Sequence, residues 1–412
     1  MNLKELSALG GVEIYMVGGC VRDTFLNIEA KDVDFVVTGI SPEKMEQLGF
    51  EKPVGVSFPV YLVEVDGHGR CEVALARTEK KTGVGYHGFE VETENVSIEE
   101  DLGRRDLTVN AMAVNYRSGE MIDPYGGLKD IEDKVLRPVS SAFKEDPLRV
   151  YRVARFAARF PEFTIADEIF GYVNDVKEEL QSLAAERVSE ELFKALKSKK
   201  PSRFFDVLDD FGVLDEHLSE IKALQVPDKH DGTAYRHVLN LLDRCGRAKK
   251  DFDMKILFGL FAHDFGKGTT PAETLPAHHD HDKRGEPMVD DFCKRMRISN
   301  ELRKFGKRCA RSHITMRRLM EMKPAKVLKF VDLYKDDFES LALVAFLDAV
   351  YRDGADPIVE GKLYKGYCSV GSKAFKTFST VTGKQLIEKG VEPGPAFGPR
   401  LLEARISHYK TL

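Results

Sequence analysis

The sequence predicts an α+β protein, in which a mixed head of strands and helices is followed by helices to the end of the chain. Residues 1–140 contain short β-rich runs, among them EIYMVGG, DVDFVVTG and FPVYLVEV, punctuated by glycines and prolines. After about residue 140, stretches such as 146–160 and 165–200 carry apolar residues at helical spacing. The 412 residues suffice for about two to four domains.

Composition excludes several classes of protein. Hydrophobic residues make up 42% of the chain and charged residues 31%, a balance typical of globular domains. No apolar run approaches the ~20 residues that span a bilayer, and MNLKELSALGG lacks the apolar core of a secretory signal. The six cysteines form no C-x-x-C pair, which favours a reducing compartment. We expect a cytoplasmic protein without a membrane partner, either a monomer or a homodimer.

Turn-forming residues mark the expected domain boundaries. Pro138 ends the α/β part, and QVPDKHDGT at 225–233 is rich in turn formers. A further break is expected near 353–370, where RDGADPIVEGKLYKGYCSVG interrupts the helical pattern. The expected domains are therefore a head, a helical neck and body, a second helical domain and a helical tail, at 1–140, 141–224, 225–350 and 351–412.

Two features of the head indicate phosphate and metal chemistry. Strand EIYMV runs into Gly18-Gly19, where the backbone can approach a ligand closely before a helix starts, with Arg22 as an added charge. In a strand, Asp32 and Asp34 would project to the same side. A divalent cation such as Mg²⁺ removes the repulsion between them, although a solvated strand end is the alternative reading. Glu72 is either a third acidic neighbour or an ordinary strand-edge residue.

Arginines recur in the next two segments. Arg104 and Arg105 are adjacent and are expected to point in different directions, so we expect only one of the two to face a triphosphate. Asp146-Pro147 is a good helix start, followed on one helical face by Arg149, Arg152, Arg155 and Arg159. We interpret this face as an unpaired cationic stripe for a polyanion, with a solvated surface as the alternative.

Asp146 and Arg149 also form a recognition pair for a nucleobase. A carboxylate only accepts hydrogen bonds and a guanidinium only donates them. Cytosine and adenine both offer an amino donor beside a ring-nitrogen acceptor, whereas uracil and guanine offer a carbonyl acceptor beside an N–H donor. The pair therefore favours C and A and penalises U and G.

At this point the motifs carry a family resemblance. GGCVRD, KDVDFVVTG, ALARTEKK with GYHGF, RRDLTVNAMA, IDPYGGLKDI and EDPLRVYRVARFAARF together resemble the class II tRNA nucleotidyltransferases, the CCA-adding enzymes. The resemblance implies a polymerase-β-like nucleotidyltransferase head followed by a helical neck, body and tail. It also implies that Asp32 and Asp34 hold Mg²⁺, and that Asp146 and Arg149 read the base. The residues it implies for contact with ATP or CTP are Gly19, Arg22, Arg105, Arg152 and Arg155.

A third group of residues indicates a second metal. His263-Asp264 ends the apolar stretch LFGLFAHD, and His237 lies 26 residues earlier. Neutral imidazole favours Ni²⁺ or another transition metal over Mg²⁺. These three residues resemble the metal-binding positions of the HD phosphohydrolases, with weaker additions from His281, His313 and the late Asp348. The resemblance to multifunctional CCA-adding enzymes implies phosphatase, 2′-nucleotidase and 2′,3′-cyclic phosphodiesterase activities here.

Basic residues concentrate at 294–329, which contains 13 Lys or Arg and two Glu, a local charge of +11 in a chain of −5. Backbone phosphates of RNA are the natural partner for such a segment, and a solvated helical surface is the alternative. We expect a template-independent enzyme that builds the 3′-terminal CCA of tRNA from CTP and ATP. The rival interpretations are a bacterial poly(A) polymerase, a CC-adding or A-adding specialist and a mainly hydrolytic HD enzyme.

Overall fold

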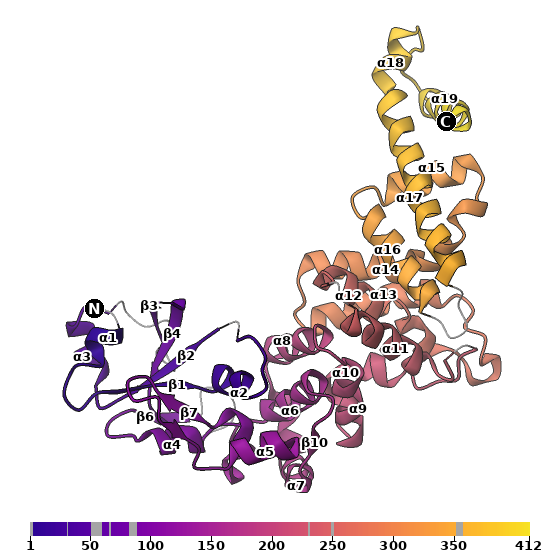
Figure 1. The fold of residues 1–412 in the computed structure, drawn as a ribbon. Coiled ribbons are helices and arrows are strands. Elements are labelled where there is room, and N and C mark those ends of the chain that lie inside the picture. Colours follow the sequence, from indigo (N-terminus) through magenta and orange to yellow (C-terminus); the bar gives the residue numbers. More distant parts are fainter. Residues whose placement is uncertain are drawn as a thin grey trace. The chain divides into compact units, whose positions relative to one another are not determined.

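The computed structural model describes residues 3–30, 32–50, 60–65, 67–81, 89–229, 231–248, 251–351 and 357–412. It confirms the α+β class, because strands form the first part of the chain and helices dominate after residue 140 (Figure 1). The contacts divide the chain into two compact units, Met1–Arg187 with Asp206–Val213 and Val188–Phe205 with Leu214–Leu412. The boundaries of the four expected domains stay predictions, and the GYHG part of the GYHGF motif lies outside the described residues.

The first unit is built on a six-stranded mixed sheet with the order β3-β4-β2-β1-β7-β8. Strands β2 and β4 run parallel, whereas β1 is antiparallel to both of its neighbours, β2 and β7. This register places the end of β1 and the starts of β2 and β7 at one end of the sheet. The strands are β1 (Glu13–Val17), β2 (Asp34–Thr38), β3 (Val60–Val65), β4 (Gly69–Leu75), β7 (Ala113–Asn115) and β8 (Met121–Ile122); two small sheets pair β5 (Thr78–Lys81) with β6 (Phe89–Glu92) and β9 (Val135–Leu136) with β10 (Thr164–Ile165).

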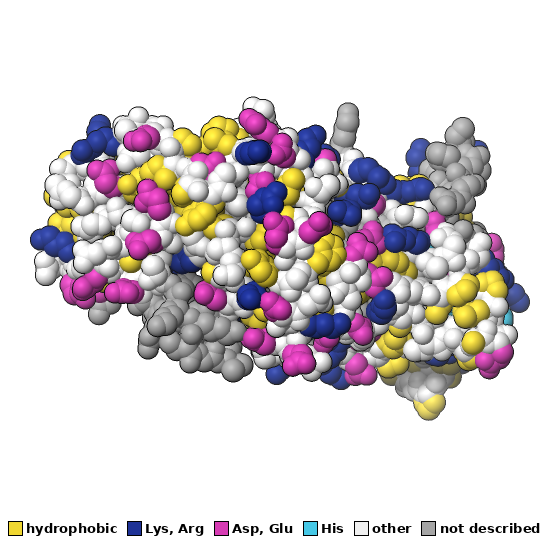
Figure 2. All heavy atoms as spheres, turned by 90° about the horizontal axis from the view of Figure 1, so that it is seen from below, with side chains coloured by type: hydrophobic (Ala, Val, Ile, Leu, Met, Phe, Trp, Pro, Cys, Tyr) yellow, Lys and Arg dark blue, Asp and Glu magenta, His cyan; other side chains and the backbone are white. Residues whose placement is uncertain are grey.

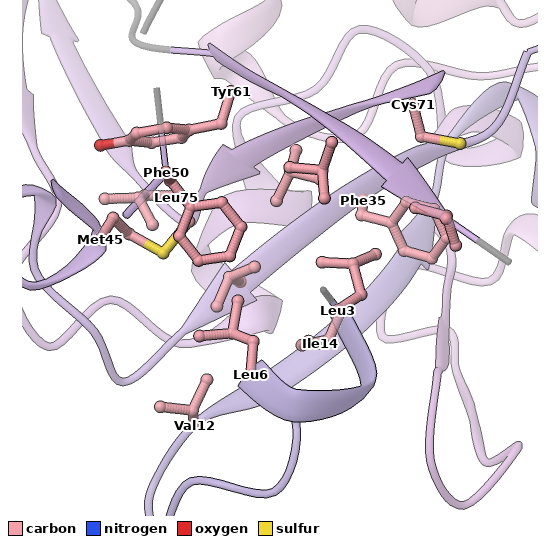
Figure 3. Close-up of a cluster of buried hydrophobic side chains, with 14 residues drawn as sticks. Leu3, Leu6, Val12, Ile14, Phe35, Met45, Phe50, Tyr61, Cys71 and Leu75 are labelled. Atoms are coloured by element: carbon pink, nitrogen blue, oxygen red, sulfur yellow. The ribbon is translucent and has the colours of Figure 1, made fainter. Parts of the chain in front are cut away.

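Both faces of the sheet are covered, which explains the apolar run that follows Asp34. Phe35 and Val37 join the cluster in Figure 3, with side chains from α1 (Leu3–Leu6) and α3 (Pro42–Gln47). Val36 faces the other way and joins a second cluster with α4 (Ile98–Gly103). A strand buried on both faces is apolar throughout its middle and polar only at its ends. Asp34 therefore stands where the buried part of the strand begins.

Helices make up most of the remaining chain. The apolar helix α12 (Met254–Ala262) is buried and contacts the helices α11, α14 and α16. The helices are α2 (Gly19–Phe25), α5 (Gly127–Asp133), α6 (Leu148–Arg159), α7 (Asp167–Val176), α8 (Ala185–Leu196), α9 (Ser202–Asp210), α10 (Leu214–Lys222), α11 (Ala234–Arg247), α12 (Met254–Ala262), α13 (His281–Arg295), α14 (Asn300–Arg317), α15 (Pro324–Leu333), α16 (Phe338–Val350), α17 (Pro357–Thr380), α18 (Gly383–Glu388) and α19 (Phe397–Thr411); the short 3₁₀ segments are η1 (Thr108–Asn110), η2 (Ser141–Glu145), η3 (Lys177–Ser182), η4 (Phe265–Thr269), η5 (Ala272–Thr274) and η6 (Leu319–Glu321).

The structure corrects one expected break. Residues 225–233 do separate α10 from α11, as their turn formers predict. The break near 353–370 is wrong for its described part, because α17 starts at Pro357 and continues through it (Figure 1). Proline is tolerated at the first position of a helix, where its missing N–H has no intrahelical partner to lose. The glycines serve close packing, since a Cβ at Gly366 would lie 2.1 Å from the Met320 sulfur and one at Gly371 2.3 Å from the Phe338 ring.

Candidate active site and metal centre

The turn between β1 and α2 carries the Gly-Gly pair. Gly18 has a φ of 71°, a left-handed conformation that glycine adopts without strain. A Cβ at this position would lie 2.7 Å from a terminal guanidinium nitrogen of Arg105. The Gly18 N–H donates to the Met112 carbonyl oxygen at 3.2 Å, so it is engaged within the protein. Gly18 therefore lets Arg105 lie against the backbone at this end of the sheet.

Three carboxylates gather beside that turn. Asp34 is the first residue of β2, and the parallel register places Glu72 of β4 directly beside it. Asp32 lies two residues before the strand starts, so the D-x-D pair straddles the strand end. Asp34 as a whole is exposed, yet the surrounding protein excludes part of the water from its carboxylate, and this desolvation raises its pKa. Glu72 and Asp32 raise this pKa further and Arg105 lowers it. A divalent cation would relieve the mutual repulsion of these carboxylates.

A pocket of about 170 Å³ faces these acids with arginines. Asp34 and Glu72 line it on one side, together with Arg77, Arg104 and Arg105. Both members of the Arg104-Arg105 pair line the same pocket. Which of them faces a triphosphate stays a prediction. Acids that suit a metal ion and cations that suit phosphate oxygens thus share one small cavity.

Asp101 explains how two adjacent arginines point the same way. It lies three and four positions before them, at the spacing that places side chains on one helical face. Its Oδ1 accepts from Arg104 at 2.7 Å and its Oδ2 from Arg105 at 3.2 Å. Burial alone would raise the pKa of this fully buried carboxyl, but the two guanidinium groups outweigh burial and lower it. Asp101 therefore orients both cations toward the pocket.

Arg22, expected to contact a triphosphate, lies in the interior with 3% of its surface exposed. Its guanidinium donates to Asp23 Oδ1 at 2.7 Å and to the Asn110 side-chain oxygen. It also lies 5.2 Å and 5.1 Å from the ring centres of Phe156 and Phe160, within cation–π range. Burial lowers the pKa of this guanidinium. As placed, Arg22 joins the turn to α6 and offers little surface to a ligand.

The proposed base-reading pair lies at the start of α6. One oxygen of Asp146 accepts from the backbone N–H of Leu148 at 3.1 Å, as expected of a residue that begins a helix. Arg149 is buried, and its guanidinium donates to the carbonyl oxygens of Ala142, at 2.7 Å, and Arg104. The second of these bonds links α6 to the backbone of the pocket arginines.

The arginine ladder on α6 is not the unpaired stripe that its spacing predicts. Arg152 pairs with buried Asp106 at 2.8 Å, and Arg159 pairs with Asp23 at 2.6 Å. The guanidinium of Arg155 lies 3.9 Å from the Phe156 ring centre. The acidic partners are 46 and 136 positions away in the sequence, so no local window contains both charges. Contact of Arg152 and Arg155 with a nucleotide stays a prediction.

Four imidazoles meet in the second unit, and all four are oriented in the same way. In each ring, Nδ1 lies within hydrogen-bond distance of an oxygen that can only accept a hydrogen bond, so Nδ1 carries the proton. Nε2 then points toward the other rings. The Nδ1 partners are the Asp231 carboxylate for His237 (2.7 Å) and the carbonyl oxygens of Leu260 for His263 (2.7 Å), His278 for His281 (2.6 Å) and Ala310 for His313 (3.0 Å).

The Nε2 atoms converge with two carboxylates into two groups, His237 with His263 and Asp348, and Asp264 with His281 and His313. In each group the ligand atoms lie within 4.8 Å of one another. Asp264 stands between the groups, because one oxygen is 3.2 Å from His263 Nε2 and the other is 3.2 Å from His281 Nε2. The predicted trio of His237, His263 and Asp264 is thus brought together.

The electrostatics of these groups suit a cation. His263 Nε2 is buried and has no hydrogen-bond partner in the described part of the chain. The Nε2 atoms of His281 and His313 lie 3.1 Å apart, and two facing lone pairs repel unless a proton or a metal lies between them. Burial lowers the pKa of His313 to about 4. Burial would also lower the pKa of His237, but Asp231 and Asp348 outweigh it and raise that pKa to about 9.

A close backbone approach brings the second group together. Gly266, three residues after His263, packs against the start of α13, where a Cβ would lie 2.0 Å from the His281 carbonyl oxygen. One residue further, the buried Lys267 ammonium lies 2.8 Å from Asp264 and 2.8 Å from Asp228. The loop after α12 therefore fixes both the carboxylate and the helix that carries His281.

Comparisons with known proteins identify the family to which the chain belongs. Residues 14–137 match the family described as Poly A polymerase head domain, and residues 162–224 match the probable RNA and SrmB-binding site of polymerase A. The Multifunctional CCA protein of Methylobacillus flagellatus is 44% identical over 331 residues, which cover 78% of each chain. That of Cupriavidus metallidurans is 43% identical over 334 residues, 78% of this chain and 79% of the relative. The chain belongs to the multifunctional CCA protein family.

Solved structures show the same fold. The Bacillus stearothermophilus CCA-adding enzyme in complex with CTP has a TM-score of 0.68 at 22% identity, over 99% of this chain and 90% of that one. The Thermotoga maritima CCA-adding enzyme complexed with tRNA-CCA has a TM-score of 0.62 at 22% identity, over 99% and 89%. In the described part of this family member, no helix is long and apolar enough to cross a membrane.

The basic segment 294–329 of this family member is balanced by acids from outside it. Arg295 pairs with Glu220 at 2.6 Å and Lys307 with Asp290 at 3.0 Å. Further pairs join Arg308 to Asp337 and Arg311 to Asp282. Basic and acidic side chains are likewise interspersed on the face shown in Figure 2. The local sum of +11 therefore overstates the field of this segment, and its contact with RNA stays a prediction.

Sequence reasoning missed several residues of both sites. Asp101 gave no separate signal, and the sequence left open which of Arg104 and Arg105 faces the site, because these placements depend on how the chain packs. Glu72 lies on a strand pattern like any other edge residue until its register with Asp34 is known. Asp231 and Asp228 lie in the turn-rich segment QVPDKHDGT, which reads only as a break between helices.

Proposed function

We propose that this protein adds and repairs the 3′-terminal CCA of tRNA, using CTP and ATP, by metal-dependent nucleotidyl transfer without a nucleic-acid template. The observation that carries this proposal is the pocket in which Asp34 and Glu72 face Arg77, Arg104 and Arg105. Family membership supports it, because the relatives bear the name Multifunctional CCA protein.

In this proposal, the acidic residues of the pocket bind the metal and the arginines bind the phosphates. Asp32 and Asp34, with Glu72 beside them, would hold Mg²⁺, which when bound supplies positive charge to phosphate oxygens and lowers the pKa of a hydroxyl. Arg104 and Arg105, held by Asp101, bind the oxygens of the triphosphate. Gly18 leaves room for Arg105. The tRNA 3′-oxygen bonds to the α-phosphorus, pyrophosphate leaves, and the hydroxyl proton passes to solvent.

Base choice falls to Asp146 and Arg149, whose acceptors and donors match C and A. Their position at the start of α6, bonded to the Arg104 carbonyl, supports a site beside the triphosphate. In this proposal Gly19, Arg152 and Arg155 contact the nucleotide directly, and Arg22 acts through the turn in which it is buried.

The test supplies tRNA that ends before CCA with CTP alone, ATP alone and then both. Addition of two C residues with CTP, completed by one A when ATP is present, is the expected result. A long A tail from ATP alone would identify a poly(A) polymerase instead, and addition of only C or only A would identify a specialist. Asp34→Asn is expected to abolish addition, while Asp175→Asn, at an exposed ion pair with Lys144, serves as the matched control.

We also propose that the second unit is an HD-type phosphohydrolase with a transition metal, Ni²⁺ among the candidates, and with phosphatase, 2′-nucleotidase and 2′,3′-cyclic phosphodiesterase activities. The orientation of the four imidazoles supports it, since each Nδ1 is held by an oxygen and each Nε2 is directed to the centre. The orphaned Nε2 of His263 fits a metal ligand. A metal bound there would supply a nucleophilic hydroxide at neutral pH.

The test measures hydrolysis of 2′,3′-cyclic AMP with and without Ni²⁺, together with the metal content of the purified protein. His263→Ala is expected to lose both metal and hydrolysis while CCA addition continues. Wild-type rates and wild-type metal content in this variant would refute the assignment. Hydrolysis by a wild-type protein that adds no nucleotide to tRNA would favour the mainly hydrolytic alternative.

A further inference from the structure

Asp146 is held at both of its oxygens. One oxygen accepts from the backbone N–H of Leu148 at 3.1 Å, and the other accepts from a terminal nitrogen of Arg187 at 2.8 Å. Arg187 stands in the first turn of α8, 41 positions from Asp146, and the two side chains are 29% and 25% exposed. No sequence motif singled out Arg187, and the roles proposed above leave it without a task.

The second bond matters because base selection depends on the orientation of a carboxylate. A carboxylate that is free to rotate about its last side-chain bond presents acceptors in many directions and discriminates poorly between amino and carbonyl groups. Because both oxygens are fixed, the lone pairs of Asp146 stay in one plane. A carboxylate has four lone pairs, of which two accept the bonds described above and two are left for a ligand. Charge-assisted bonds of this kind are stronger than neutral ones.

Arg187 also competes for the Asp146 carboxylate with Arg149, a cation that lies closer to Asp146 in the sequence. Arg149 follows Asp146 by three positions, and this chain shows that such spacing allows an ion pair, because Arg104 reaches Asp101 at 2.7 Å. Without Arg187, attraction would draw Asp146 toward Arg149, and the acceptor and donors that read the base would neutralise each other.

We propose that Arg187 is a positioning residue for base selection, which acts by holding the Asp146 carboxylate in its reading orientation. The inference rests on the proposed function, since it assigns a task only to an enzyme that chooses C and A. It predicts that Arg187 affects the choice among nucleotides more than the rate of transfer.

The experiment compares the wild type with Arg187→Ala, Arg187→Lys and Asp146→Asn and with the double variant of Arg187→Ala and Asp146→Asn. Single-nucleotide addition to tRNA is measured with CTP, UTP, ATP and GTP, and binding of CTP and UTP is measured without tRNA. In Arg187→Ala the ratio of kcat/KM for CTP over UTP should fall by about tenfold or more, the scale of one lost charged hydrogen bond. Arg187→Lys should restore part of it.

The double variant separates positioning from a merely structural role. If Arg187 acts through Asp146, the double variant should discriminate no worse than Asp146→Asn alone. Lys144→Ala, which breaks an exposed ion pair with Asp175 in the same unit, should leave the ratio unchanged. Melting curves establish that the variants fold, and Arg187→Gln replaces Arg187→Ala if that variant does not.

Unchanged discrimination in a folded Arg187 variant would overturn the inference, as would losses that simply add in the double variant. Failure of the proposed function gives a different result, because the wild-type protein would then add no CCA and would bind CTP no better than UTP.

Discussion

Gly266 offers a direct test of how the second unit assembles its metal centre. The residue lies in η4, just after His263-Asp264, and packs against the first turn of α13, which begins at His281. In Gly266→Ala the new Cβ would meet two backbone atoms of α13, at 2.0 Å from the His281 carbonyl oxygen and 2.6 Å from the Gly285 nitrogen. No flexible side chain stands there to move aside.

The size of the displacement follows from these distances. Ordinary contacts of a Cβ begin at 3.4 Å, so η4 and α13 must separate by about 1.4 Å, the difference from 2.0 Å. His281 lies 3.2 Å from Asp264 and 3.1 Å from His313, and a shift of this size would break both approaches. Overpacking of a filled interior costs about 1–3 kcal/mol of unfolding free energy.

Three measurements check this prediction. Gly266→Ala should bind less Ni²⁺, hydrolyse 2′,3′-cyclic AMP slowly and lower the melting temperature of the second unit, while CCA addition by the first unit continues. Gly398→Ala is the matched control, because a Cβ at Gly398 in α19 has nothing within 4 Å. If Gly266→Ala keeps wild-type metal content and hydrolysis, the close approach of η4 to α13 does not build the site.

Three further substitutions test the first unit. Gly18→Ala places a Cβ 2.7 Å from Arg105 at a φ of 71°, so we expect KM for CTP and ATP to rise about tenfold in addition assays, with hydrolysis unchanged. Asp101→Asn removes the shared partner of Arg104 and Arg105 and should cost about 3 kcal/mol of unfolding free energy. Because the pKa of Asp101 is lowered in the folded state, this carboxylate stabilises the fold at pH values above its unfolded pKa of about 3.9. The stabilisation is lost as the pH falls through the folded pKa. Denaturant melts below pH 4 should therefore depend less steeply on pH in the variant than in the wild type. Tyr61→Phe removes a buried hydroxyl that has no partner among the described residues and should raise the unfolding free energy by about 1 kcal/mol in the same melts; a loss of stability would reveal a partner.

The sequence predicted features that depend on local order along the chain. The apolar run Phe35-Val36-Val37 and the polar start at Asp34 indicate a buried strand with a polar end. Likewise the apolar α12 followed by His263 places a polar pair at the end of a buried helix. In both cases a few neighbouring residues contain the whole signal, so no knowledge of the fold is needed.

Features that depend on pairing between distant segments were predicted poorly. The ladder on α6 looked unpaired because Asp106 and Asp23, the partners of Arg152 and Arg159, stand 46 and 136 positions away. Glycines near 366 and 371 looked like turn formers, although they make room for Met320 and Phe338 against a continuous helix. A sequence window sums charge and propensity locally, whereas burial and Coulomb energy depend on distance in space.

The pairing of the arginines changes what nucleotide binding must achieve. An arginine that already donates to Asp101 or Asp106 is fixed in orientation, so a triphosphate finds its donors in place and loses little entropy in ordering them. The same pairing lowers the free energy gained on binding, because the carboxylate already neutralises part of the arginine's charge before the phosphate oxygens bind. We therefore expect moderate affinity with strict geometry, so that the pocket would determine where the triphosphate lies more than how tightly it binds. Loss of Asp101 should accordingly loosen the position of the nucleotide, lowering kcat along with binding, whereas loss of Arg105 alone should act mainly on KM.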